Sequence, residues 1–144
     1  MPQEQIECET IEGPRKLERV SCFACSPSNS RGLHLDFHLD ESGKMAAQWI
    51  PEAELEGFRG IAHGGIVSTV LDEAMAKAVA ATGIDALTAE MRVRFRQEVS
   101  TAVPVLVRGW IESRKRRIFR TEASVTGPDG NELAHAWATF LEVK

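Results

Sequence analysis

The chain has 144 residues, 43% of them hydrophobic and 26% charged, with a formal net charge of −4. This length suits one domain with a single core, the composition is that of an ordinary soluble globular protein, and the negative charge argues against a nucleic-acid partner. The sequence contains no run of about 18 apolar residues that would predict a membrane span, so we expect no membrane partner. The N-terminus is acidic, unlike that of a signal peptide, and we expect a cytoplasmic location.

Residues 1–30 lack hydrophobic periodicity, and we expect them to form an N-terminal extension to a single domain over residues 31–144. The extension contains all three cysteines, Cys8, Cys22 and Cys25. An odd number of cysteines in a chain of this size predicts no disulfide framework and fits a reducing compartment.

The Cys22-x-x-Cys25 spacing suggests a metal site or a redox dithiol, but the neighbouring residues favour neither. His34 and His38 lie on a predicted strand, where four residues separate side chains by about 13 Å, too far to share one zinc ion. A redox dithiol lies at the start of a helix, whereas the sequence S-P-S-N-S-R-G after Cys25 is typical of a turn. We therefore expect structural cysteines, no metal and no cofactor.

Two strands are predicted before the middle of the chain. Apolar and polar residues alternate strictly over residues 33–39, which indicates a half-buried strand. The sequence D-E-S-G at 40–43 is a turn, and residues 44–50 form a second strand, so the two make a hairpin that ends at Pro51.

A long helix is predicted over residues 63–81, where the apolar period becomes helical, and Gly83 is placed to end it. Four more strands follow at 87–99, 105–113, 118–126 and 132–143. The helix has a broad apolar arc, wide enough for a sheet to wrap around it, made of Ile66, Val67, Val70, Leu71, Ala74, Met75 and Ala78.

Short connections between the later strands make neighbouring strands antiparallel. The predicted fold class is therefore α+β, with an antiparallel sheet of five or six strands wrapped around one long central helix, which is the hotdog fold. Such a sheet leaves edge strands unpaired, so we expect a homodimer, and further a homotetramer built as a dimer of dimers.

Gly64 and Gly65 begin the predicted helix, where backbone N–H groups have no internal partner and carry a positive partial charge. Neither glycine has a side chain to obstruct an approaching oxygen. A carbonyl that becomes an oxyanion could bind these amides, although two glycines alone are more often explained by close packing of the helix against a strand.

Asp72 and Glu73 fall on different faces of the predicted helix. Glu73 lies beside Lys77, in an i,i+4 pair typical of a solvated face, so we expect it to be an ordinary surface residue. Asp72 instead shares its face with small residues, Ser68 among them, which leaves room for a substrate or a partner helix.

The distance between Gly64 and Asp72 predicts how they could act together. Eight residues of helix span about 12 Å, more than an aspartate side chain can reach, so one chain cannot bring both groups to one carbonyl. Two antiparallel copies of the helix about a twofold axis would place Gly64 of each beside Asp72 of the other. The spacing therefore predicts a site shared across a dimer interface.

These residues resemble a known family. The pattern H-G-G-x-x-x-x-x-x-D at His63 to Asp72 is similar to the signature of the PaaI-type hotdog-fold acyl-CoA thioesterases, in the 4-hydroxybenzoyl-CoA thioesterase superfamily. The segment C-F-A-C-S-P-S-N-S-R-G-L at 22–33 resembles C-F-x-C-G-x-x-N-P-x-G-L in one group of these enzymes. T-A-E-M-R-V-R-F from Thr88 resembles their strand after the helix.

The resemblance implies roles for individual residues. Gly64 would supply the oxyanion-binding amide, the partner's Asp72 would be the catalytic carboxylate, Thr88 would position the attacking water and His63 would hold the loop before the helix. Asp72 could act as a general base or attack the thioester directly. Two departures are Ser26 and Ser30, in place of Gly and Pro. A third is Gly57, where some relatives have an asparagine that touches the thioester.

Substrate binding would require cations for the phosphates of coenzyme A, and contacts near the helix start. Besides Gly65 and Ser68, the candidates are the basic cluster Arg114, Lys115, Arg116 and Arg117, which could equally be a solvated hairpin end. Arg92, Arg94 and Arg96 share one strand face, where they could bind the nucleotide, contact another dimer or, most simply, be solvated. Candidates for lining the acyl pocket are Trp49, Phe58 and Met75.

The expected function is hydrolysis of an acyl-CoA thioester to the free acid and coenzyme A. One alternative within the fold is a hydratase or dehydratase, with His63 and Asp72 or Glu73 as its pair, but the Phe-Pro-Gly-type loop of such enzymes is absent. Another is a non-catalytic module that binds acyl-CoA, although Asp72 is present. Neither the acyl group nor the exact role of Asp72 follows from the sequence.

Overall fold

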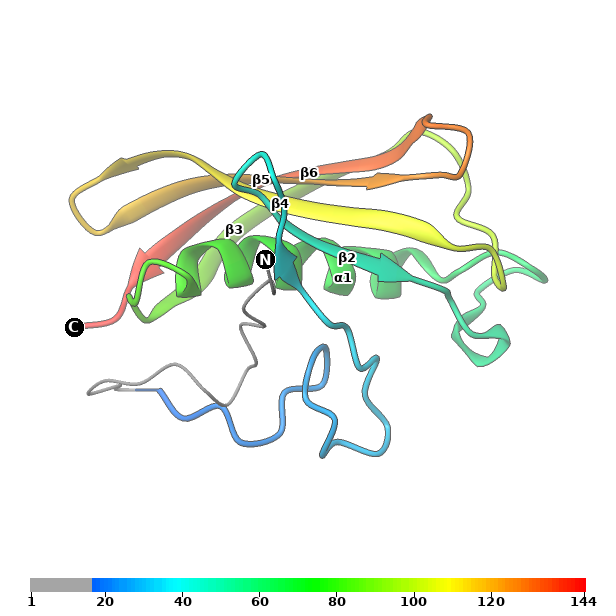
Figure 1. Cartoon of the computed structure of the whole chain (residues 1–144), viewed down its shortest axis with the longest axis horizontal. Helices are drawn as coiled ribbons and strands as arrows, with labels where there is room; N and C mark the ends of the chain where they lie inside the picture. The colour runs from blue at the N-terminus through cyan, green and yellow to red at the C-terminus, as the bar shows by residue number, and fades with distance from the viewer. Residues whose placement is uncertain (1–16) are drawn as a thin grey trace.

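The computed structural model describes residues 17–144. It contains one antiparallel six-stranded sheet and one long helix, and Figure 1 shows the sheet curved over one side of the helix. This arrangement confirms the predicted α+β hotdog fold. The sheet order is β1-β2-β4-β5-β6-β3, and the elements are β1 (His38–Leu39), β2 (Met45–Trp49), a 3-10 turn η1 (Ala53–Leu55), α1 (Gly64–Ala80), β3 (Ala86–Phe95), β4 (Val105–Lys115), β5 (Ile118–Thr126) and β6 (Glu132–Glu142).

The first predicted strand is wrong in extent, because β1 contains only His38 and Leu39. The backbone before it pairs with the N-terminal segment instead: the Leu33 and Leu35 amides donate to the carbonyls of Phe23 and Ala24 at 2.8 and 2.9 Å. His34 between them has a φ of 54°, which interrupts extended backbone. The alternation over 33–39 therefore reflects burial of Leu35 and Phe37 rather than strand pairing.

Two later strands also differ in length from the prediction. β3 ends at Phe95 rather than at residue 99, because the amides of Arg96 and Gln97 both turn to the Leu133 carbonyl. β4 continues two residues beyond 113, to Lys115, so half of the basic cluster belongs to a strand. The other predicted elements agree with the structure to within two residues.

The contact between α1 and β4 is unusually close. A Cβ atom on Gly109 of β4 would lie 2.3 Å from the backbone carbon and oxygen of Ala74, and 2.8 Å from the Met75 nitrogen. The backbone of α1 is therefore in direct contact with the backbone of β4 at this point. Around this contact Val70, Leu71, Ala74 and Met75 are completely buried, which makes α1 the centre of the core.

We expect Gly109→Ala to lower the free energy of unfolding by about 1 to 3 kcal/mol or more, because backbone atoms cannot rotate away from the added methyl group. Denaturant unfolding followed by circular dichroism measures the loss. Ser113→Ala, at an exposed position of the same strand, is the control and should change little. Equal stability of the two variants would show that α1 does not pack this closely.

The face of α1 opposite the sheet corrects a prediction, because Glu73 and Lys77 are not surface residues. Glu73 is only 9% exposed and Lys77 only 1%. Figure 1 shows residues 17–35 on this side of the helix, and the Cys22 thiol lies 3.8 Å from the Glu73 carboxylate. Burial raises the pKa of Glu73 and lowers the pKa of Lys77, while the attraction between the two charges opposes both shifts.

A buried ion pair loses much stability when one partner is removed. We expect Glu73→Gln to lower the free energy of unfolding by about 3 kcal/mol, because the buried Lys77 ammonium then loses the carboxylate that most stabilises its charge. The double variant Glu73→Gln/Lys77→Met should regain most of this loss. Urea denaturation of both variants tests the pair, and a single variant as stable as the unmodified protein would contradict its burial.

Among residues 17–144 no helix is both long and apolar enough to cross a membrane.

Candidate functional site

The start of α1 presents one backbone amide without an internal acceptor. His63 is the N-cap residue; its carbonyl accepts from Ile66 and Val67, and its Nδ1 accepts from the Gly65 amide at 2.9 Å. Within the described residues the Gly64 N–H has no acceptor. Of the two glycine amides considered for an oxyanion, Gly64 is therefore the one available to a ligand.

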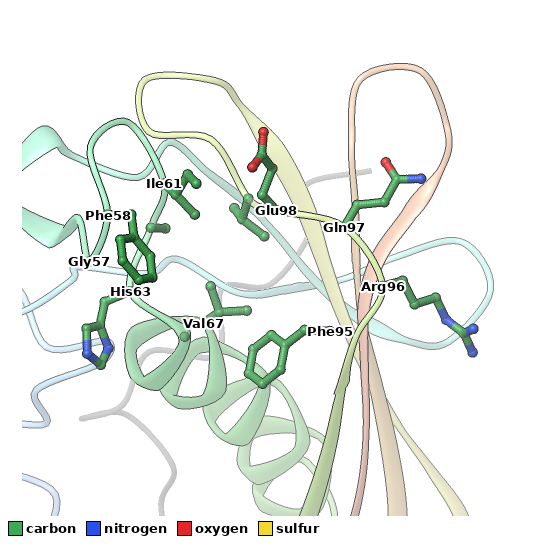
Figure 2. A pocket seen from close by; sticks show the side chains of 12 residues that line it. Gly57, Phe58, Ile61, His63, Val67, Phe95, Arg96, Gln97 and Glu98 are labelled. Atoms are coloured by element: carbon green, nitrogen blue, oxygen red, sulfur yellow. The ribbon is translucent and has the colours of Figure 1, made fainter.

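A cavity of about 440 Å³ opens beside this amide. Figure 2 shows that its walls come from the loop before α1, the first turn of α1 and the segment after β3. Of the three candidates for lining an acyl pocket, Phe58 lines this cavity, whereas Trp49 and Met75 lie in the core at 5% and 0% exposure. The lining residues are Gly57, Phe58, Ile61, Ala62, His63, Gly64, Val67, Phe95, Arg96, Gln97, Glu98 and Val99.

Asp72 lies further along α1 and binds Thr88 of β3. The Thr88 hydroxyl donates to Asp72 Oδ1 at 2.7 Å. The register between β3 and β6 shifts between Thr88 and Glu90, and such a bulge redirects side chains next to functional sites. Burial raises the pKa of Asp72, and the hydrogen bond from Thr88 partly opposes that rise.

Gly64 lies beside Phe95 near one end of the contact between α1 and β3, and Asp72 lies beside Thr88 further along the same contact. A Cβ atom on Gly64 would be 3.6 Å from the Phe95 ring, while Asp72 contacts Thr88 near the other end of β3. The structure thus brings Asp72 and Thr88 together. It does not bring Asp72 to Gly64 of the same chain, since eight helical residues span about 12 Å.

Two further candidates have partners in the helix itself. The Ser68 hydroxyl donates to the Gly64 carbonyl at 2.9 Å, one turn earlier. The Gly65 amide donates to the capping imidazole of His63, and a Cβ atom on Gly65 would lie 3.0 Å from His63 Nδ1. Both residues therefore help to shape the helix start, and their contact with a substrate remains a prediction.

The basic cluster at 114–117 lies at the opposite end of α1 from Gly64 (Figure 1). Arg114 pairs with Glu142 at 3.7 Å and lies over the Phe119 ring at 4.7 Å. Arg117 donates to the Glu142 carbonyl at 2.7 Å. These contacts support the β4–β5 hairpin, and within one chain the cluster is remote from the Gly64 cavity.

Cys22, Cys25 and Glu73 are the group of possible metal-binding side chains found in residues 17–144, with donor atoms within 4.8 Å of one another. Metal binding would require both sulfurs as thiolates. Cys22 is a free thiol, but Cys25 is disulfide-bonded. The Glu73 carboxylate already interacts with the positive charge of Lys77. The arrangement therefore does not fit a metal site.

The thioesterase superfamily model matches residues 59–134, more than half of the chain, and this protein belongs to that superfamily. The matched region contains Gly64, Asp72 and Thr88. A comparison with curated proteins gives no match.

Solved structures of thioesterases share the fold. Protein RHA08564, a thioesterase superfamily protein, is 20% identical with a TM-score of 0.80, over 84% of this chain and 63% of that one, so the present chain spans less than two thirds of that relative. A hypothetical thioesterase protein with coenzyme A from Streptococcus pneumoniae TIGR4 is 17% identical (TM-score 0.67, 69% and 81% coverage). It is also known with alanine replacing an aspartate, or replacing a threonine sixteen residues later.

A third structure is a phenylacetic acid degradation-related thioesterase from Ralstonia eutropha JMP134. It is 23% identical with a TM-score of 0.70, over 82% of this chain and 92% of that one. These likenesses agree with the hotdog fold predicted from the sequence.

Proposed function

We propose that this protein is an acyl-CoA thioesterase of the PaaI type, which hydrolyses an acyl-CoA to the free acid and coenzyme A at sites shared between two subunits. The observation that carries the proposal is the arrangement of α1 and β3. They present a Gly64 amide without an acceptor in residues 17–144 at one end, and a carboxylate bound to Thr88 towards the other.

The position of β3 at the edge of the sheet supports the proposed dimer. An edge strand offers unpaired backbone groups, and a second β3 is a natural partner for it. Since α1 and β3 run antiparallel, a twofold axis near their middles would bring Gly64 and Phe95 of one subunit towards Asp72 and Thr88 of the other. Two equivalent sites would form, each with both catalytic groups.

In each site the Gly64 N–H would donate to the thioester oxygen and stabilise the negative charge that develops there. The partner's Asp72 would activate a water molecule as a general base, or attack the thioester carbon itself. The partner's Thr88 would hold the carboxylate and the water. His63 would act on the loop and on the helix start, since its Nδ1 caps the helix.

The relatives support this chemistry. One binds coenzyme A, and its aspartate and threonine variants are separated by the same sixteen residues as Asp72 and Thr88. Another is named for phenylacetic acid degradation, in agreement with a PaaI-type assignment. In such a dimer, coenzyme A would reach the basic cluster at 114–117 of the neighbouring subunit. We propose that the protein is cytoplasmic and is a homodimer or a dimer of dimers.

Release of free thiol from a panel of acyl-CoA thioesters tests the proposal. A thioesterase releases coenzyme A in proportion to substrate consumed. A non-catalytic binding module would bind the same compounds without release, and a hydratase would change the absorbance of an enoyl-CoA without releasing thiol. Absence of thiol release from every member of a broad panel would contradict the proposed function.

Thr88 should influence the pH dependence of the reaction. Its hydrogen bond lowers the pKa of Asp72, so Thr88→Ala should raise that pKa further above its ordinary value. Because catalysis requires the ionised carboxylate, the acidic limb of kcat/KM should move to higher pH, while Thr88→Ser should retain the original profile. An acidic limb that does not move would show that Thr88 does not tune Asp72.

A further inference from the structure

We infer that the cavity at the start of α1 holds the acyl group of the substrate, and that Phe58 and Phe95 determine which acyl groups are accepted. The acyl groups that fit are uncharged, apolar and short to medium in length. This inference rests on the proposed thioesterase function and adds to it the class of substrate.

The position of Phe95 links the cavity to the reacting carbonyl. Its ring lies 3.6 Å from where a Cβ atom of Gly64 would be, so it is a neighbour of the residue that carries the proposed oxyanion amide. A thioester carbonyl bound to that amide has two substituents, the sulfur of coenzyme A and the first carbon of the acyl group. Because Gly64 is one of the residues that line the cavity, we place one of these two branches in it.

The residues that line the cavity favour binding of the acyl group over binding of the coenzyme A arm. Among residues 17–144, Arg96 is the single lysine or arginine that lines the cavity, and it is paired with Glu132 at 3.1 Å. Glu98 adds a carboxylate to the same wall. The phosphates of coenzyme A require cations and the amides of its pantetheine arm require hydrogen-bond partners, whereas an alkyl or aryl group requires neither.

Two exposed aromatic side chains form the sides of the cavity. Phe58 on the loop is 84% exposed and Phe95 at the end of β3 is 52% exposed. Figure 2 shows their rings on either side of Val67. An apolar acyl group between the rings would remove apolar surface from water. The volume of about 440 Å³ lies in the lower part of the range for ligand pockets, which disfavours long-chain acyl groups.

The test compares kcat/KM for butanoyl-, octanoyl-, dodecanoyl- and succinyl-CoA. In the unmodified protein succinyl-CoA should be at least about tenfold poorer than butanoyl-CoA, because its carboxylate would enter an apolar cavity beside Glu98. In Phe95→Ala and Phe58→Ala the ratio of dodecanoyl to butanoyl should rise about tenfold as the cavity lengthens. Phe95→Leu should lie between, and Phe23→Ala, an exposed phenylalanine outside the cavity, should not change the ratio.

A change in kcat/KM by the same factor for every acyl group would overturn the inference, because it would place coenzyme A rather than the acyl group in the cavity. Calorimetry separates this outcome from failure of the proposed function, because it measures the affinities of the same acyl-CoAs for Asp72→Asn and for Phe95→Ala without requiring turnover. If no protein releases thiol, affinities that depend on the acyl group, and that change in Phe95→Ala, still support the acyl cavity. Affinities that do not depend on the acyl group, in either protein, would overturn it.

Discussion

Asp72→Asn should reduce kcat for thioester hydrolysis by about 100- to 10,000-fold, the range over which a positioned acid or base contributes to a reaction. Asparagine has nearly the same shape, and its carbonyl oxygen can still accept the hydrogen bond from Thr88. It cannot take a proton from water or attack the thioester. Steady-state thiol release measures the loss, and Asp129→Asn in the exposed turn before β6 is the matched control.

The stability of the same variant separates catalysis from folding. Because burial raises the pKa of Asp72 in the folded chain, this residue lowers stability as the pH rises through that pKa. Asp72→Asn removes this partly buried charge and should be at least as stable as the unmodified protein at neutral pH. An inactive but unfolded variant would leave the catalytic role unsupported, and full activity would remove Asp72 from the mechanism.

Gly64→Pro should lower kcat by about 100- to 1,000-fold, because it deletes the N–H proposed to bind the oxyanion. The backbone can accept proline here, since the first helical position tolerates it and His63 before it is extended, with a ψ of 131°. Thiol release under saturating substrate measures the effect on kcat.

Gly64→Ala is the control for this variant, because it retains the N–H. The new methyl group would lie 3.6 Å from the Phe95 ring, an ordinary contact. Alanine should therefore keep most of the activity that proline loses. If Gly64→Pro keeps as much activity as Gly64→Ala, the amide is not the oxyanion donor.

The sequence was sufficient to predict the hotdog fold and the start of α1. Helical periodicity and the His-Gly-Gly pattern placed the helix within one residue, and β5 agrees with its predicted range 118–126. These elements have amphipathic patterns that depend on their own residues. The role of Thr88 in positioning water came only from the family resemblance, and its hydrogen bond to Asp72 came only from the structure, because spacing alone does not specify which strand lies beside the helix.

Other features depended on contacts that no periodicity contains. Glu73 and Lys77 form an i,i+4 pair that is common on solvated faces, but the segment 17–35, which has no regular pattern of its own, lies over them. Within this segment Leu33 and Leu35 pair with Phe23 and Ala24, which shortens the first strand. Phe95 lies within the predicted strand 87–99, and nothing in the pattern of that strand marks it as a cavity residue.

The central claim, that Gly64 and Asp72 meet across a dimer interface, is tested most directly by mixing the two inactive variants. Gly64→Pro and Asp72→Asn, with different affinity tags, are unfolded together and refolded as an equal mixture, and mixed dimers are verified by tandem purification. Random pairing makes about half of the dimers mixed, and each has one site with both defects and one with neither, so about a quarter of the original activity should return. Mixed dimers that form but remain inactive would contradict the shared site.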